Sequence, residues 1–359
     1  MGRSRPSHSE AGAAPTASAT AQTVTARGPD EAAGTPPAAR PVLMGYAWKA
    51  GTLVELASTD DVRAAYADPK ARMWVDLTDP SHDVVGEIAR CMGIHHLIAE
   101  DIVERNQRAK VELFGELLHL VMYGLLYEGE LISVELDIVL GKRFLLTAHE
   151  SGWDPARATA LRVDGVGRYL AEGTDYLLWA LTDALVDSYF PVFDRVGDEI
   201  DTLQEDVMGS PSSWVVERLF QVRRDLLTIR RTVTPQREIF NQLTNRDMKL
   251  IDPARIVYFR DVYDHLIRLT DELDSFREMV GTTLDAYLST VNNNLSEIMK
   301  RLTAVTAVLA GVGALAGIFG MSEAGLALSL VDARFWIVSA TIVLVGLLGF
   351  VYFRRIGWI

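Results

Sequence analysis

The chain has 359 residues and a formal net charge of −13, from 48 acidic and 35 basic side chains. Nucleic-acid binding normally needs a concentrated basic face, so this charge argues against a nucleic-acid partner and favours a protein body that attracts cations. The single cysteine, Cys91, excludes an intrachain disulfide and is typical of a reducing compartment. Residues 1–41 are rich in Ala, Pro, Ser, Thr and Gly and lack the continuous apolar centre of a signal peptide, so we predict a disordered tail.

An α/β domain is predicted for residues 42–165, where short strand and helix patterns mix. Strands are expected at four mostly apolar runs, Met73–Leu77, Leu118–Leu126, Leu131–Leu140 and Arg143–Ala148. Helices are expected at Asp83–Met92 and Leu97–Val103. Gly129 and the Gly141-Lys142 pair separate the last three strands, which is typical of an antiparallel meander.

A helical hairpin is predicted for residues 166–251. Thr174–Val207 has apolar residues at helical spacing, and Gly209-Ser210-Pro211 should end this helix. Ser212 or Ser213 can cap a second helix that runs to about Asn245. The first helix has an acidic face of Asp194, Asp198, Glu199, Asp201, Glu205 and Asp206, and the second carries Arg223, Arg224, Arg230, Arg231 and Arg237. We therefore predict an antiparallel acidic–basic helix pair and interpret its charges as a solvated face.

A stalk helix is predicted for residues 252–301, continuing into an apolar span. Asp252 followed by Pro253 is a favourable cap and first turn, and no proline interrupts the pattern from there to Met321. An unbroken helix of that length would extend about 100 Å, at about 1.5 Å per residue. So long a rod needs partners, and a bundle of copies of the same chain is the simplest source.

Two apolar segments near the end of the chain predict a transmembrane hairpin. Residues 302–322 form one run without a charge, and residues 335–353 form another. Each is long enough to cross a hydrocarbon core of about 30 Å as a helix. One hairpin cannot enclose a polar pathway, so a transport function would require an oligomer.

The charges that flank the hairpin predict its orientation. Lys300 and Arg301 precede the first span, and Arg354 and Arg355 follow the second, in the tail of residues 354–359. Basic residues are retained on the cytoplasmic side. Both termini are therefore expected in the cytoplasm, and residues 323–334 are expected as a short periplasmic loop.

The glycines of the first apolar segment do not indicate a nucleotide site. Gly311, Gly313 and Gly317 lie inside an apolar span and lack the preceding strand of a phosphate-binding loop. Gly313 and Gly317 instead form a small-xxx-small pair. Such a pair would serve either close helix packing or a pore wall without bulky side chains.

Metal-ligand and nucleophile patterns are weak elsewhere. Cys91 lies near His95 and His96, but no second ligand pair follows at a zinc-site spacing. We find no Ser-His-Asp or Cys-His arrangement and no carboxylate pair in an evident cleft. The sequence therefore does not predict an enzyme.

Several motifs together resemble the CorA family of magnesium channels. The stalk and first span carry Tyr287-Leu288-Ser289, Glu297–Thr303 and Ala316–Met321. The upstream motifs are Gly93-Ile94-His95, Ile98–Asp101, Gln107–Glu112, Asp175–Leu178, Asp183–Asp187 and Tyr258–His265. The resemblance covers nearly everything after residue 41, and it gives His95 a structural role in a turn.

The resemblance implies an α+β cytoplasmic domain joined to a long helical stalk and a two-helix transmembrane hairpin, assembled as a funnel-shaped homopentamer. In this family, cytoplasmic Mg²⁺ binds between subunits and holds the pore closed. The matching positions are Asp101 on one subunit and Asp261 on its neighbour. The pore and selectivity positions implied are Met299, Leu302, Ala310, Gly313, Gly317, Gly320, Met321, Ser322 and Glu323.

The outer pore mouth departs from the family pattern. The family signature Gly-Met-Asn is replaced by Gly320-Met321-Ser322, and Glu323 follows directly in place of the usual Met-Pro-Glu-Leu loop. Five serine hydroxyls would form a wider ring with weaker acceptors than five asparagine amides. Ions would then be attracted by the Glu323 carboxylates with little discrimination, which predicts weaker selectivity for Mg²⁺.

The inner part of the pore departs from the pattern as well. Ser296 stands where the family commonly has an Asn, and the middle of the span lacks the usual proline. Ala310, Gly311 and Gly313 occupy the stretch where larger residues often constrict the pore. These differences put both selectivity and conduction in question.

The resemblance predicts a divalent-cation channel of a bacterial inner membrane that passes Mg²⁺ inward, and Co²⁺ or Ni²⁺ as further ions. Its expected partners are four copies of itself and membrane lipid, with no nucleic acid and no small-molecule substrate other than metal ions. Two alternatives stay open. One is a Zn²⁺-transporting relative like the ZntB branch, or a channel of relaxed selectivity, and the other is a non-conducting, membrane-anchored metal sensor.

Overall fold

The computed structural model describes residues 42–128, 130–151, 163–209, 212–245, 248–321 and 333–358. The predicted tail of residues 1–41, the pore-mouth residues Ser322 and Glu323 and most of the predicted periplasmic loop lie outside the described residues.

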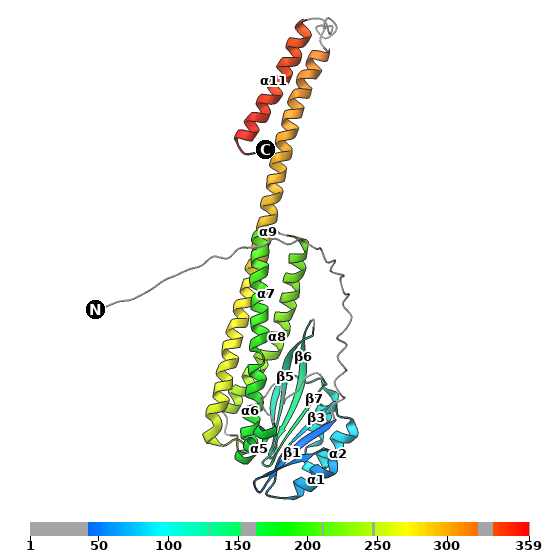
Figure 1. Ribbon diagram of the computed structural model, residues 1–359, viewed down its shortest axis with the longest axis vertical. Helices are drawn as coiled ribbons and strands as arrows, with labels where there is room; N and C mark the ends of the chain where they lie inside the picture. Colours follow the sequence, from blue (N-terminus) through cyan, green and yellow to red (C-terminus); the bar gives the residue numbers. More distant parts are fainter. Residues whose placement is uncertain are drawn as a thin grey trace, which may run out of the picture. The chain divides into compact units, whose positions relative to one another are not determined.

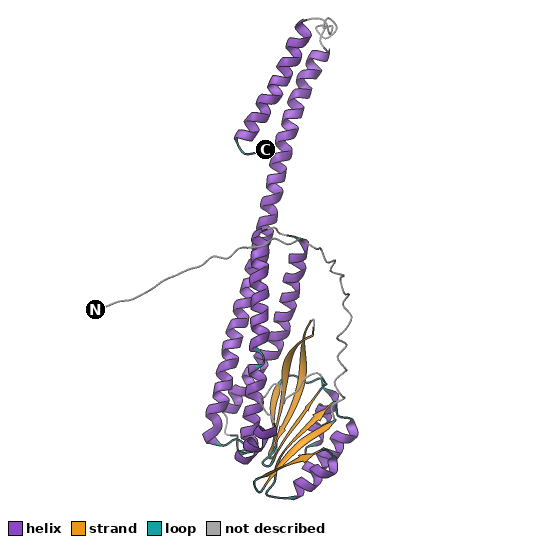
Figure 2. Cartoon of the chain, viewed as in Figure 1, coloured by secondary structure: helices purple, strands orange, loops and turns teal. Residues whose placement is uncertain are grey.

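A seven-stranded sheet, in the order β2-β1-β3-β7-β6-β5-β4, is the centre of the α/β domain (Figure 2). Its strands are β1 (Leu43–Lys49), β2 (Thr52–Leu56), β3 (Arg72–Thr78), β4 (Lys110–Phe114), β5 (Leu117–Glu128), β6 (Glu130–Leu140) and β7 (Phe144–His149). The four predicted strands are present as β3, β5, β6 and β7, and the last three form the predicted antiparallel meander. β3 and β7 pair in parallel, which joins the meander to the β1–β2 hairpin.

Three short helices cover one face of the sheet: α1 (Thr59–Ala67), α2 (His82–Met92) and α3 (His96–Glu104). Val75 and Leu77 of β3 are fully buried beneath them, with Ile88 of α2 and Ile98 of α3. His95 caps α3, because its Nδ1 accepts a hydrogen bond of 3.3 Å from the backbone N–H of Leu97. The structural role expected for His95 is therefore confirmed.

Helices α5 (Val163–Glu172), α6 (Thr174–Asp187) and α7 (Phe190–Gly209) belong to the core on the opposite face of the sheet. The prediction of one helix over Thr174–Val207 is wrong, because the helix is interrupted by a turn at Ser188 and Tyr189. Pro191 explains the break, since proline lacks the N–H and its ring clashes with the preceding turn. The buried Tyr189 fixes the junction by donating its hydroxyl proton to the carbonyl oxygen of Tyr123 on β5.

Helix α8 (Ser213–Asn245) packs along both α7 and the long helix α9 (Ile256–Met321), most extensively along α9 (Figure 1). Arg218 of α8 forms an ion pair with Glu199 of α7, so acidic and basic side chains do meet between these helices. The last helix, α11 (Ala333–Arg355), packs against the end of α9.

Candidate functional site

The long helix is anchored at its start by a carboxylate of α6. Asp252 caps the short 3₁₀ turn Pro253–Arg255, from which α9 continues without interruption to Met321. Asp175 accepts a hydrogen bond from the backbone N–H of Asp252 and pairs with Arg255 Nη1 at 2.6 Å. The predicted stalk is therefore one continuous helix with the predicted cap.

Two helices in the described part of the chain are long and apolar enough to cross a membrane. The apolar windows lie in Pro253–Gly320 and Trp336–Arg355, with mean hydropathies of 2.1 and 2.2. Only 6% and 0% of these windows are buried within the chain. Apolar surface on this scale requires lipid or further protein to cover it.

One face of α9 is used for packing against α11. Along this face lie Ala304, which is fully buried, and the half-buried Val308 and Val312. A Cβ added at Gly346 of α11 would lie 3.1 Å from Val312 Cγ2, and one at Gly349 would lie 3.4 Å from Val308 Cγ2. These two glycines, which are not predicted as contact positions from the sequence, permit the close approach of the two helices.

The predicted pore residues lie on the opposite face of α9. At about 100° per residue, the following positions fall within about 80° of one another, roughly opposite Val308. This open face of α9 consists of Met299, Leu302, Thr306, Ala310, Gly313, Gly317 and Gly320. Met299 and Leu302 are 53% and 58% exposed, and a Cβ at any of the three glycines would meet no atom within 4 Å. Gly313 and Gly317 therefore do not mediate the α9–α11 contact, and both packing against another copy and a pore wall stay open as roles.

The backbone of α9 ends at Met321, whose side chain is not described, and Ser322 and Glu323 lie outside the described residues. The mouth of the predicted pore is therefore known from the sequence alone. Its arrangement stays a prediction.

Asp261 lies near an acidic cluster between α6 and α9 and acts on it electrostatically. Suitable ligand atoms of Asp183, Asp187 and His265 lie within 4.8 Å of one another, with His265 Nδ1 3.3 Å from Asp187 Oδ1. Burial, together with the charges of Asp187 and Asp261, raises the pKa of Asp183 to about 6, although His265 acts in the opposite direction. The sequence placed Asp183 and Asp187 in a family motif but did not identify them as site residues.

Asp101 belongs to a second cluster, between α3 and the edge of the sheet. Its Oδ2 accepts a hydrogen bond of 2.8 Å from Lys110 Nζ and lies 4.0 Å from His119 Nδ1. Glu112 of β4 is 3.1 Å from the same ammonium group. Ligand atoms of Asp101, Glu112 and His119 lie within 4.8 Å of one another.

Asp101 and Asp261 are not brought together within one subunit: no hydrogen bond or ion pair joins them among the residues that the structure describes. Two groups of potential metal ligands are found among the described residues. One of them contains Asp101, and the other lies near Asp261. Neither group includes Cys91, His95 or His96.

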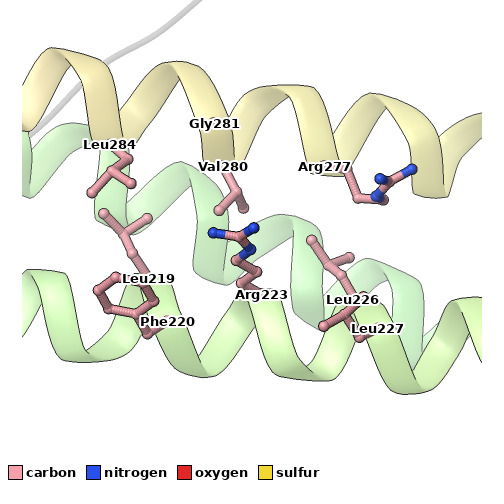
Figure 3. A pocket seen from close by; sticks show the side chains of 9 residues that line it. All are labelled: Leu219, Phe220, Arg223, Leu226, Leu227, Arg277, Val280, Gly281 and Leu284. Atoms are coloured by element: carbon pink, nitrogen blue, oxygen red, sulfur yellow. The ribbon is translucent and has the colours of Figure 1, made fainter.

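A groove of about 280 Å³ lies between α8 and α9 (Figure 3). None of the residues that line it belongs to either group of potential metal ligands. Arg223 and Arg277 line it among apolar side chains that include Leu219, Phe220 and Leu284. No carboxylate is among the described residues that line this groove, so its chemistry is unsuited to a cation.

The chain matches a known protein family over most of its length. The sequence profile of the CorA-like Mg²⁺ transporter protein family matches residues 70–355. A cobalt/magnesium transport protein CorA of Thermotoga maritima is 34% identical over 310 residues, which cover 84% of this chain and 88% of the relative. The fold and these matches therefore define the class of the protein: it is a metal-ion transport protein of the membrane with two spans. The chain belongs to the CorA family.

Solved structures agree with this fold. The complete structure of the CorA magnesium transporter from Methanocaldococcus jannaschii superimposes with a TM-score of 0.73 at 22% identity, covering 89% of this chain and 99% of that chain. The full-length CmaX protein superimposes with a TM-score of 0.69 at 17% identity, with the same coverage. The expected architecture, a soluble α/β domain, a long helix and two apolar C-terminal helices, is thus confirmed.

Proposed function

We propose that this divalent metal cation transporter assembles as a homopentamer and passes hydrated Mg²⁺ inward across a bacterial inner membrane, with Co²⁺ and Ni²⁺ as further ions. The observation that carries the proposal is the open face of α9. It lies opposite the α11 contact, carries no charge and has small residues, Ala310, Gly313, Gly317 and Gly320, over most of its apolar length. Five such faces around an axis would line a pathway that is free of bulky side chains from Ala310 to Gly320.

The driving force for such a channel is the membrane potential, which contributes roughly 2.3 kcal/mol per elementary charge per 100 mV. A divalent ion gains about twice that on moving inward. Mg²⁺ dehydrates reluctantly, and a face of glycine and alanine leaves room for an ion that keeps its water. The protein therefore contributes a path and a gate, and no covalent step.

The gate in this proposal lies between Asp101 of one subunit and Asp261 of its neighbour. Carboxylates that face each other across an interface repel unless a divalent cation bridges them. Asp183 and Asp187 add acidic charge beside Asp261, which would increase both the repulsion and the attraction of a cation. Loss of cytoplasmic Mg²⁺ would then loosen the interface and favour opening.

A flux experiment tests the proposal by comparing the same alanine-to-leucine substitution on α9 and on α11. Ala310→Leu adds a leucine to the open face, whereas Ala340→Leu adds the same side chain to the exposed side of α11, away from Gly349. In vesicles given Mg²⁺, Co²⁺, Ni²⁺ and Zn²⁺ in competition, Ala310→Leu should reduce all uptake severalfold, and Ala340→Leu should not. Equal uptake by the two variants would contradict the pore assignment.

The wild-type result of the same assay decides between the proposal and its alternatives. Uptake that favours Zn²⁺ over Mg²⁺ would indicate a zinc transporter. A wild-type chain that carries no divalent ion, yet still responds to Mg²⁺ through Asp101 and Asp261, would indicate a membrane-anchored metal sensor.

A further inference from the structure

The cluster around Asp101 contains a histidine whose position follows from the sheet. β4 and β5 pair antiparallel with Glu112 directly opposite His119, so both side chains lie on the same face of the sheet. Lys110, two residues before Glu112, shares this face. Helix α3 covers it and places the Asp101 carboxylate within 4.0 Å of His119 Nδ1.

His119 is fully buried, and among the described residues only its Nε2 has a hydrogen-bond partner. Its Nε2 lies 2.8 Å from Oδ1 of the buried Asp137 on β6. The carboxylate favours a proton on Nε2, which leaves the lone pair on Nδ1. Nδ1 is buried and has no hydrogen-bond partner among the described residues, although it points toward Asp101. A buried polar atom without a partner is costly, so Nδ1 is a position where a further partner would be stabilising.

The contact of His119 with Asp137 is the arrangement found behind metal-binding histidines. A carboxylate that accepts from one ring nitrogen orients the imidazole and makes the other nitrogen a better donor to a metal. In this chain the other nitrogen faces the two carboxylates Asp101 and Glu112. All three ligand atoms lie within 4.8 Å of one another, so modest side-chain adjustment would bring them to bonding distance of one ion.

We propose that Asp101, Glu112 and His119 of a single subunit form a binding site for a transition-metal dication such as Zn²⁺, Co²⁺ or Ni²⁺. One imidazole nitrogen with two carboxylates is a donor set that these ions accept, whereas Mg²⁺ prefers oxygen ligands alone. The site shares Asp101 with the proposed Mg²⁺ gate, but its ligands all come from one chain. It therefore goes beyond the proposed function and does not require a pentamer.

Lys110 occupies the position of the cation in the absence of metal. Its Nζ lies 2.8 Å from Asp101 Oδ2 and 3.1 Å from Glu112 Oε2, where it neutralises the two carboxylates. β4 is an edge strand, and a lysine has a flexible stem, so Lys110 can swing toward solvent when an ion enters. The metal must displace this ammonium group, which makes Lys110 an internal competitor.

This competition gives two substitutions with opposite effects. Purified full-length protein is titrated with Zn²⁺ by calorimetry in millimolar Mg²⁺, and with Co²⁺ by visible absorption. His119→Gln should weaken the Mg²⁺-resistant site by at least tenfold, and Lys110→Met should tighten it by at least tenfold. Thermal unfolding of each variant shows that it is folded. Unchanged Zn²⁺ affinity in either variant would overturn the proposal.

Matched controls separate this site from its neighbours. His96→Gln removes an exposed histidine of the same helix as Asp101 and should leave the affinity unchanged. Asp261→Ala and His265→Gln alter the other cluster and should also leave the Mg²⁺-resistant site in place. If Asp261→Ala abolishes that site, the metal lies between subunits and the intrasubunit proposal is wrong. Because the assay measures binding alone, absence of ion flux would not affect its outcome.

Discussion

Val312 of α9 lies against Gly346 of α11 so closely that a Cβ on the glycine would be 3.1 Å from Val312 Cγ2. This contact, and the similar one between Val308 and Gly349, orient the face of α9 that turns away from α11. The position of the open face thus depends on two glycines of the second apolar helix.

Gly346→Leu should destabilise the α9–α11 hairpin by about 1–3 kcal/mol, because overpacking a close contact forces side chains or backbone to move. Ala340→Leu, on the exposed side of the same helix, should have little effect. Thermal unfolding in detergent measures the difference. Equal stability of the two variants would contradict the close contact.

Gly313→Leu and Gly317→Leu should act on assembly or conduction rather than on the fold of the single chain, because a Cβ at either position would meet no atom of another element within 4 Å. We expect native mass spectrometry to give a pentamer for the wild type. Each variant should either lower the pentamer fraction or keep it while blocking flux. A wild-type mass of a monomer or dimer under mild conditions would contradict the assembly.

Asp101→Ala and Asp261→Ala should each weaken the protection that Mg²⁺ gives the cytoplasmic domain against protease, because each removes one carboxylate from the proposed bridge. A Mg²⁺ titration with limited proteolysis measures the shift in midpoint. If both variants keep wild-type protection throughout the titration, the sensor lies elsewhere, with the acidic face of α7 as the next candidate.

Ser322→Asn should raise the preference for Mg²⁺ over other divalent ions, because an amide oxygen is a stronger and longer-reaching acceptor for the waters of a hydrated ion. Glu323→Gln should reduce uptake of every divalent ion, and wild-type uptake should fall as ionic strength rises, since charge attraction is screened by salt. Competition flux at two salt concentrations measures these effects. Unchanged uptake in Glu323→Gln would show that the Glu323 carboxylates do not attract the transported ions.

Asp183 should make stability depend on pH in metal-free protein. Burial raises its pKa to about 6, so the folded state holds the proton more tightly than the unfolded state does. The stability associated with this group is present at low pH and is lost as the pH rises to about 6. Asp183→Asn should remove this loss and be more stable than wild type at pH 7, by roughly 1–3 kcal/mol.

Denaturant unfolding of wild type and Asp183→Asn in the presence of a chelator, between pH 4 and pH 8, gives the difference directly. Asp194→Asn, which removes an exposed carboxylate of α7, serves as the control. A stability difference between wild type and Asp183→Asn that does not change with pH would show that Asp183 titrates in its ordinary range.

The features predicted best from the sequence are those encoded by local pattern. The long α9 helix followed from the absence of proline after Pro253 and from the Asp252 cap, and the two spans followed from uninterrupted apolar runs. The buried strands β5, β6 and β7 were predicted because their apolar runs are long and separated by glycine. β1, β2 and β4 were missed; β2 and β4, at the two edges of the sheet, have mixed polarity with much of their surface exposed.

The break between α6 and α7 does have a local signal: Pro191 lies in the first turn of α7, although the apolar spacing continues across the break. The sequence could indicate Asp101 and Asp261 only through a family resemblance, because no local pattern distinguishes them from the many other acidic residues of the chain.

Only the tertiary structure decided which of these charged residues lie together. The register of β4 on β5 sets Glu112 opposite His119, through a strand pairing that neither strand specifies alone. The packing of α6 on α9 brings Asp183 near His265, which lies far away in the sequence. The sequence by itself determined a long helix, two apolar spans and a surplus of carboxylates, since those depend on composition and short-range periodicity. Which carboxylates share a cation depends on contacts between elements, and those form only when the sheet and the helices pack.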